Sequence, residues 1–224
     1  MTAVFIVSAP SGSGKSTLVE KVRPLIPELD FSVSYTTRKP RGPEKDRREY
    51  CFVPVSEFEI MIRRDEFLEY AIVVGNYYGT AKRTLEEAVR AGHDLLLDID
   101  VNGAEQVKRK IPDAVRIFIL PPSRQELEKR LRLRSQNSEE EIQKRLTTAT
   151  REIEKYSEYD YILVNDRLEE SVAALEAILH AERLRRSGSK PCSEQEAAFL
   201  AHADARRLEN VRERVQPILA SFGC

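Results

Sequence analysis

A glycine-rich segment near the start of the chain has the residue types and spacing of a phosphate-binding loop. Residues 9–16 read Ala-Pro-Ser-Gly-Ser-Gly-Lys-Ser, which fits the P-loop pattern with Ala in its first position. The two glycines let successive backbone N–H groups face one centre, Lys15 can reach the β- and γ-phosphates, and Ser16 can place a hydroxyl on Mg²⁺. An apolar run over residues 3–8 precedes the loop and a helical pattern over residues 15–23 follows it. This context favours a nucleoside triphosphate site over a Gly/Ser loop with a chance lysine.

A basic segment, residues 34–50, is the second candidate for chemistry. It carries six basic and three acidic residues, so its local charge is positive. Arg38 and Arg41 flank a Lys-Pro turn, and Tyr50 opens the next apolar run. Guanidinium groups and a phenol hydroxyl are suitable donors for a second phosphate. Taken alone, however, the segment is more typical of a solvated charged loop.

Two carboxylates, Asp98 and Asp100, follow the apolar residues 95–97. On a strand they share one face, at the carboxyl edge where open α/β sheets bind ligands. Two adjacent carboxylates repel each other unless a cation or a donor engages them. A ligand role is therefore expected, with a capping or surface role for one of them as the alternative.

Short apolar runs rich in Val, Ile, Phe and Tyr alternate with amphipathic segments along the chain, which predicts an α/β fold. The runs expected to be strands are residues 3–9, 31–37, 50–54, 69–74, 94–100, 114–120 and 159–164. Continuous apolar stretches such as residues 95–97 and 117–120 are typical of parallel strands buried on both faces. Helix starts are predicted by four capping boxes, at Ser56/Glu59, Thr84/Glu87, Ser123/Glu126 and Ser138/Glu141.

The composition limits the partners and the compartment. The 36 basic residues against 37 acidic ones give a net charge of -1, so whole-chain charge indicates neither nucleic-acid nor membrane-surface binding. No apolar run approaches the roughly 20 residues of a membrane span. The three scattered cysteines form no disulfide framework or metal-ligand spacing, which suits a reducing cytoplasm. The sequence leaves the oligomeric state open, a homo-oligomer included.

Several uncommon strings follow one another along the chain: Ser34-x-Thr-Thr-Arg-x-Pro-Arg41, Tyr50-x-Phe52, Phe67-Leu-Glu69, Asn76-Tyr-Tyr-Gly-Thr80, Asp98-Ile-Asp-Val-x-Gly103, Arg130-Leu-x-x-Arg134, Lys144-Arg-Leu146 and Asn165-Asp-x-Leu168. In their content and order these strings resemble the guanylate kinase family. The resemblance spans residues 3–186 and implies a P-loop core with a parallel sheet, an inserted GMP-binding subdomain and a mobile helical lid. It also implies transfer of a phosphoryl group from ATP to GMP, giving ADP and GDP.

The resemblance assigns roles to residues on both sides of the expected reaction. Expected GMP-binding residues are Ser34, Arg38, Arg41, Tyr50, Glu69, Tyr78, Thr80 and Asp100, with Glu69 on the guanine. Expected ATP-binding residues are Ser11, Gly12, Ser13, Gly14, Lys15, Ser16, Thr17, Arg134 and Asn165. Expected catalytic residues are Lys15, Arg38, Arg130, Arg134 and Arg145, and Ser16 and Asp98 are expected around Mg²⁺. For Asn165, capping of the last helix of the kinase region is the alternative.

The resemblance also implies a domain organisation, with departures from the family pattern. Residues 1–186 form the expected kinase region, with the subdomain at about 34–82 and the lid at about 124–155. Residues 187–224 form a C-terminal extension with no counterpart in that pattern, expected to be partly helical and interrupted or kinked at Pro217. The departures are Pro43 and Arg47 where Gly is usual, Asn102 where Gln is usual, and Ser135 where Gly is usual.

Two other functions compete with this interpretation. A kinase of the same fold acting on another phosphorylated acceptor, such as a ribose bisphosphate, would lack the guanine-binding set. A catalytically inactive scaffold that binds phosphopeptides would lack P-loop and lid residues. Both sets are present in this chain, which favours the kinase of GMP.

Overall fold

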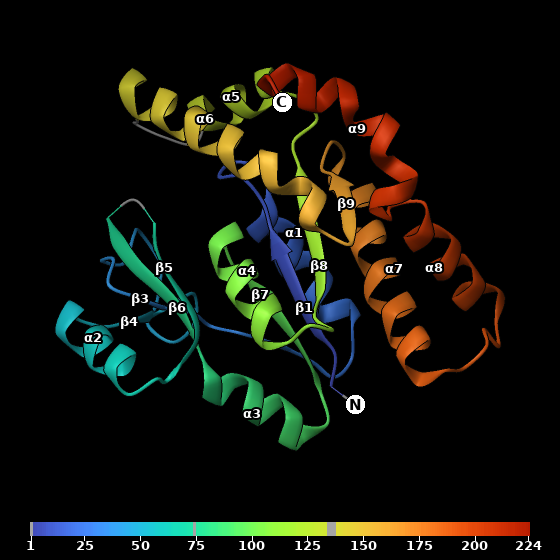
Figure 1. Ribbon diagram of the computed structural model, residues 1–224, viewed down its shortest axis with the longest axis horizontal. Helices are drawn as coiled ribbons and strands as arrows, with labels where there is room; N and C mark the ends of the chain where they lie inside the picture. The colour runs from blue at the N-terminus through green and yellow to red at the C-terminus, as the bar shows by residue number, and fades with distance from the viewer. Residues whose placement is uncertain (1, 74, 134–137) are drawn as a thin grey trace. The chain divides into compact units, whose positions relative to one another are not determined.

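The computed structural model describes residues 2–73, 75–133 and 138–224. These residues form two compact units, one of residues 1–6 and 28–114 and the other of residues 7–27 and 115–224. The elements follow the chain from blue to red in Figure 1. Strand β1 (Val4–Ser8) begins in the first unit and ends in the second.

The first unit holds most of the strands. Its further elements are β2 (Leu29–Phe31), β3 (Tyr35–Thr36), β4 (Cys51–Phe52), α2 (Val55–Arg63), β5 (Phe67–Val73), β6 (Asn76–Ala81), α3 (Lys82–Ala91), β7 (Asp94–Asp98) and α4 (Val101–Lys110). The second unit is mainly helical. Its elements are α1 (Lys15–Val22), η1 (Arg23–Leu25), β8 (Val115–Leu120), α5 (Arg124–Leu133), α6 (Glu139–Ile153), η2 (Glu154–Glu158), β9 (Tyr161–Val164), α7 (Leu168–Ser187), α8 (Glu194–Asp204) and α9 (Leu208–Phe222).

A parallel sheet has the strand order β2-β7-β1-β8-β9. In the first unit β2 pairs in parallel with β7, with Leu29 opposite Asp94. In the second, β8 pairs in parallel with β9, with Ile117 opposite Tyr161. Residues 95–97 and 117–120 are fully buried, which confirms the prediction of strands covered on both faces.

A second sheet lies wholly in the first unit, with the order β4-β3-β6-β5. Its longest pairing is the antiparallel ladder of β5 and β6, in which Glu69 lies opposite Thr80. Helix α2 covers one face of this sheet (Figure 1). Its Phe58 and Met61 pack against Tyr35 and Phe67. The pairing of β5 with β6 therefore holds Glu69 and Thr80 next to each other in the sheet.

The structure differs from the sequence prediction at several element boundaries. The run at residues 31–37 divides between β2 and β3, which belong to different sheets. Of the four predicted capping boxes, the one at Ser138 and Glu141 is confirmed in full. The helices α2 and α3 begin before Ser56 and Thr84, so these residues lie in a first turn and do not cap it. The string at residues 76–80 forms most of strand β6, which the pattern of apolar runs does not predict.

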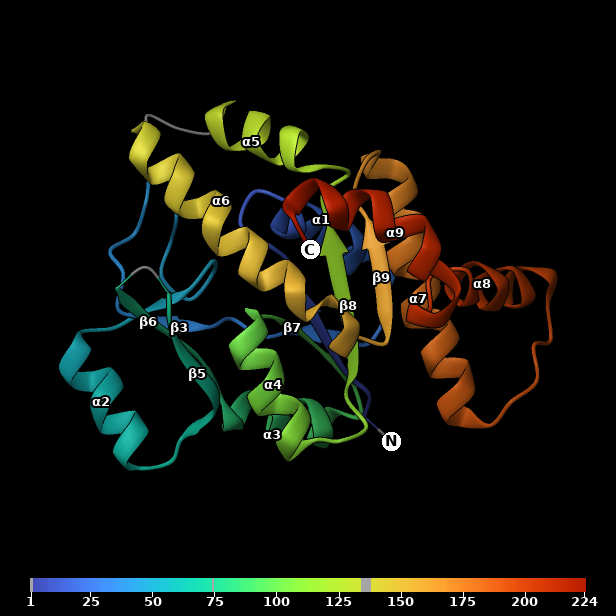
Figure 2. The ribbon, with the colours of Figure 1, turned by 45° about the horizontal axis from the view of Figure 1, so that its top comes forward.

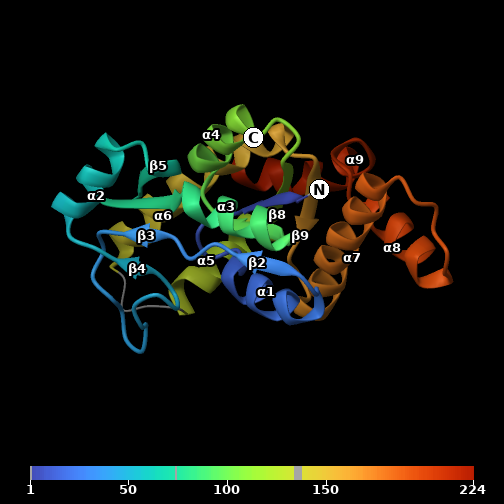
Figure 3. The same cartoon turned by 90° about the horizontal axis from the view of Figure 1, so that it is seen from below.

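The C-terminal extension forms two helices in the second unit. Helix α8 lies beside α7, as Figures 1 and 3 show, and α9 runs across β9 in Figure 2. Ser193 caps α8 by accepting a hydrogen bond from the Glu196 N–H at 3.1 Å. Helix α9 continues through Pro217, so the expected interruption at this residue does not occur. No helix of the described residues is long and apolar enough to cross a membrane.

Candidate active site

The glycine-rich loop of the second unit connects β1 to α1. Gly12 and Gly14 have φ angles of 96° and 88°, in the left-handed region that favours glycine. Lys15, Ser16 and Thr17 form the first turn of α1, in which Gly14 is the N-cap and no side chain caps the helix. The N–H groups of this turn and the positive end of the helix dipole therefore face the loop, as an anion site requires.

Asn165 holds the loop from the end of β9. Its side chain is buried, and Nδ2 donates a hydrogen bond to the Ser13 carbonyl at 2.7 Å. A Cβ on Gly14 would collide with this same Nδ2 atom, so only glycine fits there. The alternative role of Asn165 as a helix cap is wrong, because Arg167 is the N-cap of α7.

Helix α5 also contacts the loop. A Cβ added to Gly12 would lie 2.9 Å from side-chain atoms of Leu127 and Leu131. Between these two leucines, Arg130 donates from Nη1 to the Asn165 carbonyl at 3.0 Å and from Nε to Glu126 at 3.0 Å. Arg130, Asn165 and the loop thus form one connected cluster in the second unit.

Of the other two expected lid arginines, the structure describes only Arg145. Arg145 lies half-buried on α6. Arg134 and Ser135 lie outside the described residues. Their expected roles stay predictions.

In the first unit, Arg38 is the centre of a cluster of polar and aromatic side chains. It is 8% exposed, and its Nε donates to the Tyr78 hydroxyl at 3.1 Å. Its two terminal nitrogens donate to the two carboxylate oxygens of Glu44 at 2.8 and 2.9 Å. The guanidinium also lies 5.2 Å from the centroid of the Tyr50 ring. Arg41 lies exposed in the adjoining turn, where its backbone N–H donates to Glu44 at 2.7 Å.

Burial and neighbouring groups shift the pKa values of two side chains in this cluster. The hydrogen bonds from Arg38 hold the pKa of the Glu44 carboxyl below its usual range. Burial, together with the nearby Asp98 and Tyr78, raises the pKa of Tyr50 to about 12. Tyr50 therefore keeps its proton at neutral pH and can donate a hydrogen bond to a phosphate oxygen.

Glu69 forms the second cluster of the first unit. It is only 3% exposed, and it lies opposite Thr80, which is fully buried. Burial raises the pKa of the Glu69 carboxyl to about 7; the neighbouring Thr80 opposes this shift and the Asp100 carboxylate adds to it. Gln106 of α4 bonds both backbone groups of Tyr70, next to Glu69, which fixes α4 against β5.

Asp100 and Gly103 complete this cluster. Asp100 is the N-cap of α4 and accepts from the Gly103 N–H at 2.8 Å, so the capping alternative applies to this carboxylate. A Cβ on Gly103 would lie 3.0 Å from Glu69 Cδ and 3.2 Å from Asp100 Oδ1. Ser34 is buried just before β3, and its carbonyl accepts from the Cys51 N–H at 2.9 Å.

Sequence reasoning missed two contributors to these clusters. Gly103 was part of a recognised string without a role, and its value lies in leaving room for the Glu69 carboxyl. Glu44 was only one of three acids in a basic segment, although its carboxylate binds Arg38 through two hydrogen bonds. Neither role has a signal in residue spacing, because each depends on a contact that forms only in the folded chain.

The class of protein that this fold and these clusters define is a P-loop kinase with a separate site for a small phosphorylated acceptor. The family model described as guanylate kinase matches residues 1–182. The chain therefore belongs to the guanylate kinase family.

Individual relatives agree with the family match. A guanylate kinase of Koribacter versatilis (strain Ellin345) is 54% identical over 222 residues, covering 98% of this chain and 95% of the relative. A guanylate kinase of Escherichia coli (strain K12) is 50% identical over 190 residues, covering 84% of this chain and 91% of the relative. The crystal structure of guanylate kinase from Anaplasma phagocytophilum matches with a TM-score of 0.68 and 32% identity, covering 96% of this chain and 94% of that one.

Proposed function

We propose that this chain transfers the γ-phosphoryl group of ATP to GMP, giving ADP and GDP, as its family membership implies. The observation that carries the proposal is the buried Glu69 carboxyl, which faces Thr80 and Asp100 within the same unit as the Arg38 cluster. These two clusters offer one site for a purine base and one for a phosphate. Such a division matches a nucleoside monophosphate as the acceptor.

Glu69 accounts for the choice of guanine. Guanine presents its N1–H and N2–H₂ donors on one edge, and a carboxylate accepts a hydrogen bond from both. Adenine lacks this pair of donors and would leave the buried carboxylate without a partner, which discriminates strongly. Ser34 and Thr80 add hydroxyl groups around the base, and Asp100 lies on the same side. A ribose bisphosphate would use none of these groups.

Arg38, Arg41, Tyr50 and Tyr78 are the proposed partners of the GMP phosphate. The guanidinium of Arg38 already donates two parallel hydrogen bonds to an oxyanion, the carboxylate of Glu44. Arginine binds phosphate oxygens in the same bidentate manner. Arg38 is therefore oriented for phosphate before GMP arrives.

The P-loop residues fit the phosphates of ATP. The Ser13 hydroxyl oxygen is buried and has no hydrogen-bond partner in the described part of the chain, which suits a ligand oxygen. Ser11, Gly12, Gly14, Lys15, Ser16 and Thr17 line the same loop and helix turn. Arg134 and Asn165 are the further proposed ATP contacts.

Magnesium fits this donor set as a companion of the nucleotide. Among the described residues no group of three or more His, Cys, Asp and Glu could hold a metal ion. Mg²⁺ commonly takes one or two protein ligands and completes its coordination with phosphates and water. Ser16 and, through water, Asp98 are the proposed protein ligands, and the ion would neutralise phosphate charge.

Catalysis in this proposal is positioning and charge stabilisation. Phosphoryl transfer spreads negative charge over the equatorial oxygens of the moving group. Lys15, Arg38, Arg130, Arg134 and Arg145 are the cations proposed to stabilise it, the last three from a lid at about residues 124–155. A second proposed feature is the GMP-binding subdomain at about residues 34–82.

The experiment that tests the function is a coupled assay of the purified full chain with ATP, Mg²⁺ and GMP. We expect ADP formation that depends on GMP. Tight phosphopeptide binding without ATP turnover would instead support the scaffold alternative. The proposed compartment is the cytoplasm, since Cys51, Cys192 and Cys224 are all free.

A further inference from the structure

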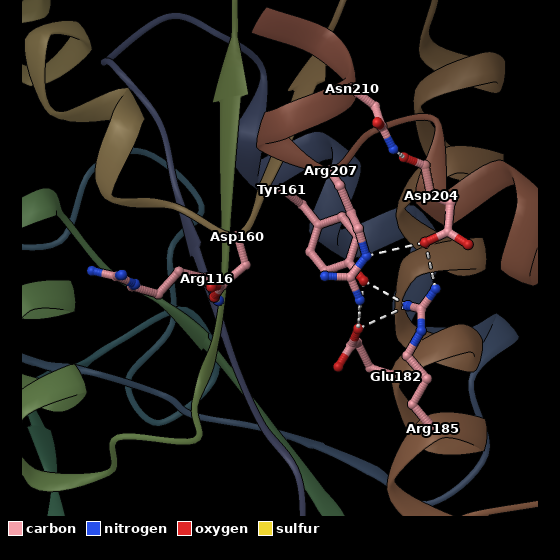
Figure 4. Close-up of polar contacts among 8 residues, drawn as sticks. All are labelled: Arg116, Asp160, Tyr161, Glu182, Arg185, Asp204, Arg207 and Asn210. Carbon is pink, nitrogen blue, oxygen red and sulfur yellow. Dashed lines mark hydrogen bonds and ion pairs between the residues drawn. The ribbon is translucent and has the colours of Figure 1, made fainter.

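The C-terminal extension, residues 187–224, is joined to the rest of the second unit by a compact group of polar side chains (Figure 4). Arg207 donates to Glu182 of α7 at 3.2 Å and to Asp204 of α8 at 3.0 Å. Arg185 donates to the same two carboxylates at 2.9 and 2.7 Å. The buried Tyr161 hydroxyl bonds Glu182 as well, and its ring lies 5.1 Å beneath the Arg207 guanidinium.

Backbone hydrogen bonds attach the extension to the edge strand β9. Tyr161 and Arg207 form an antiparallel bridge. The Ile162 N–H donates to the Arg206 carbonyl at 2.9 Å, and the Leu208 N–H donates to the Asp160 carbonyl at 3.1 Å. The segment between α8 and α9 therefore covers the outer edge of β9, which would otherwise present unpaired backbone groups.

Helix α9 then reaches the lid helix α5. Its buried face consists of Val211, Val215, Leu219 and Phe222. Close to its end, the Ser221 hydroxyl accepts a hydrogen bond from the backbone N–H of Arg124, the first residue of α5, at 3.0 Å. Ser123, the residue directly before α5, caps the same helix by accepting from the Glu126 N–H at 3.1 Å. The extension thus supplies α5 with a second N-terminal cap.

The extension contacts strand β9 and helix α5, and both elements position residues of the proposed ATP site. Strand β9 ends at Val164, directly before Asn165, whose side chain holds the Ser13 carbonyl. Helix α5 carries Arg130, which bonds the Asn165 carbonyl. We propose that residues 187–224 are a positioning element for ATP, with Arg207 fixing β9 and Ser221 fixing α5 so that Asn165 and Arg130 stay on the P-loop.

The proposal rests on the proposed kinase function, so its test measures binding of each nucleotide separately from turnover. Ser221→Ala removes the distant cap of α5. Ser193→Ala is the matched control, because it removes a cap of the same kind from α8, within the same extension. The measurement is the dissociation constant of a non-hydrolysable ATP analogue with Mg²⁺, and of GMP alone, for each full-length variant.

We expect Ser221→Ala to weaken binding of the ATP analogue by up to about fivefold, the equilibrium factor of one helix cap. The affinity for GMP should stay unchanged in Ser221→Ala. Ser193→Ala should bind both nucleotides as the original chain does. Ser221→Thr should keep the original affinity for the ATP analogue, because it keeps the hydroxyl. Equal weakening of both nucleotides, or equal effects of the two alanine variants, would overturn the proposal. Failure of GMP-dependent turnover in all variants, with this binding pattern intact, would instead contradict the kinase function alone.

A second pair of variants tests the attachment at β9. Arg207→Ala removes the hydrogen bonds to Glu182 and Asp204. The control, Arg212→Ala, removes an exposed arginine from the adjoining helix α9. The expected result is weaker binding of the ATP analogue for Arg207→Ala only. An unchanged affinity in a folded Arg207→Ala variant would contradict the proposed role of this attachment.

Discussion

Glu69 is the residue at which folding and recognition place opposite demands on one group. Burial favours the neutral carboxylic acid and raises the pKa of this side chain to about 7. The two donors of guanine favour the carboxylate, because only that form accepts both hydrogen bonds. Binding of GMP is therefore expected to draw the proton from Glu69.

The pH dependence of GMP use tests this account of Glu69. The value of kcat/KM for GMP should rise as pH increases toward about 7 and then level off, as Glu69 becomes ionised in the free enzyme. Glu69→Gln should lower kcat/KM at least about a hundredfold and remove this limb of the profile. Titration of the GMP phosphate affects the original chain and the Glu69→Gln variant alike. The difference between their two pH profiles therefore comes from the ionisation of Glu69. Unchanged GMP selectivity in Glu69→Gln would contradict the role.

The same group makes stability depend on pH in the opposite direction. Its pKa in the folded chain, about 7, is above the reference value of 4.5, so the folded state binds more protons between these values. Stability should fall as pH rises through this window, by an amount on the order of 3 kcal/mol from Glu69. Chemical denaturation of the ligand-free protein should show this loss, which Glu69→Gln should lack and the exposed Glu59→Gln should retain.

Lys15 provides the residue-scale test of the P-loop. Lys15→Ala should lower kcat by about a hundredfold to a thousandfold, because a cation at the transferred phosphates is lost. GMP affinity, measured by calorimetric titration, should remain, since the GMP residues lie in the other unit. Lys21→Ala, an exposed change on the same helix, is the control. Loss of GMP affinity in Lys15→Ala would show that the P-loop has been assigned to the wrong ligand.

At the scale of elements, the start of α4 and strand β5 must approach closely at Glu69. Gly103→Ala should raise the KM for GMP by about tenfold or more, because the new methyl group would occupy the place of the Glu69 carboxyl. ATP-analogue binding should be unaffected. Asn102→Ala, an exposed change one residue earlier, should have little effect on either ligand. An unchanged KM for GMP in Gly103→Ala would contradict the tight fit.

The turn before β4 contains a residue in a costly conformation. Arg47 has a φ of 60°, in the left-handed region, where the family pattern usually has glycine. Arg47→Gly should stabilise the protein by about 0.5 to 1 kcal/mol. Glycine removes the energy cost of the left-handed conformation, and the greater flexibility of glycine in the unfolded chain offsets part of this gain. The neighbouring Arg48→Gly should destabilise it, because Arg48 has no such strain. Thermal unfolding of both variants gives the comparison, and destabilisation by Arg47→Gly would contradict it.

Elements with a strong local signal could be predicted from the sequence, whereas their partners could not. The apolar stretches at residues 95–97 and 117–120 are confirmed as buried parallel strands. The run at residues 31–37 predicts one strand, because no local signal shows that β2 and β3 enter different sheets. The P-loop was recognisable because its chemistry lies in consecutive residues. Glu44 and Gly103 act through contacts with distant residues, which spacing does not encode.

At the scale of the whole molecule, charge and chemistry are local. The formal net charge of -1 conceals the pairing of Arg38 with two tyrosines and Glu44 in one unit and the Lys15 loop in the other. The groups proposed to bind GMP lie in residues 28–114, and the P-loop, Asn165 and Arg130 lie in residues 7–27 and 115–224. The extension belongs to the second unit, which is why we expect it to act on ATP and not on GMP.

The most direct test of the central claim is the ratio of kcat/KM for GMP to that for AMP, measured with ATP and Mg²⁺ on the full chain. A buried carboxylate that must accept both donors of guanine predicts a ratio on the order of 10⁴. A ribose bisphosphate tested in the same assay should give no turnover. A ratio near one, or a preference for the sugar phosphate, would contradict the assignment of Glu69 to guanine.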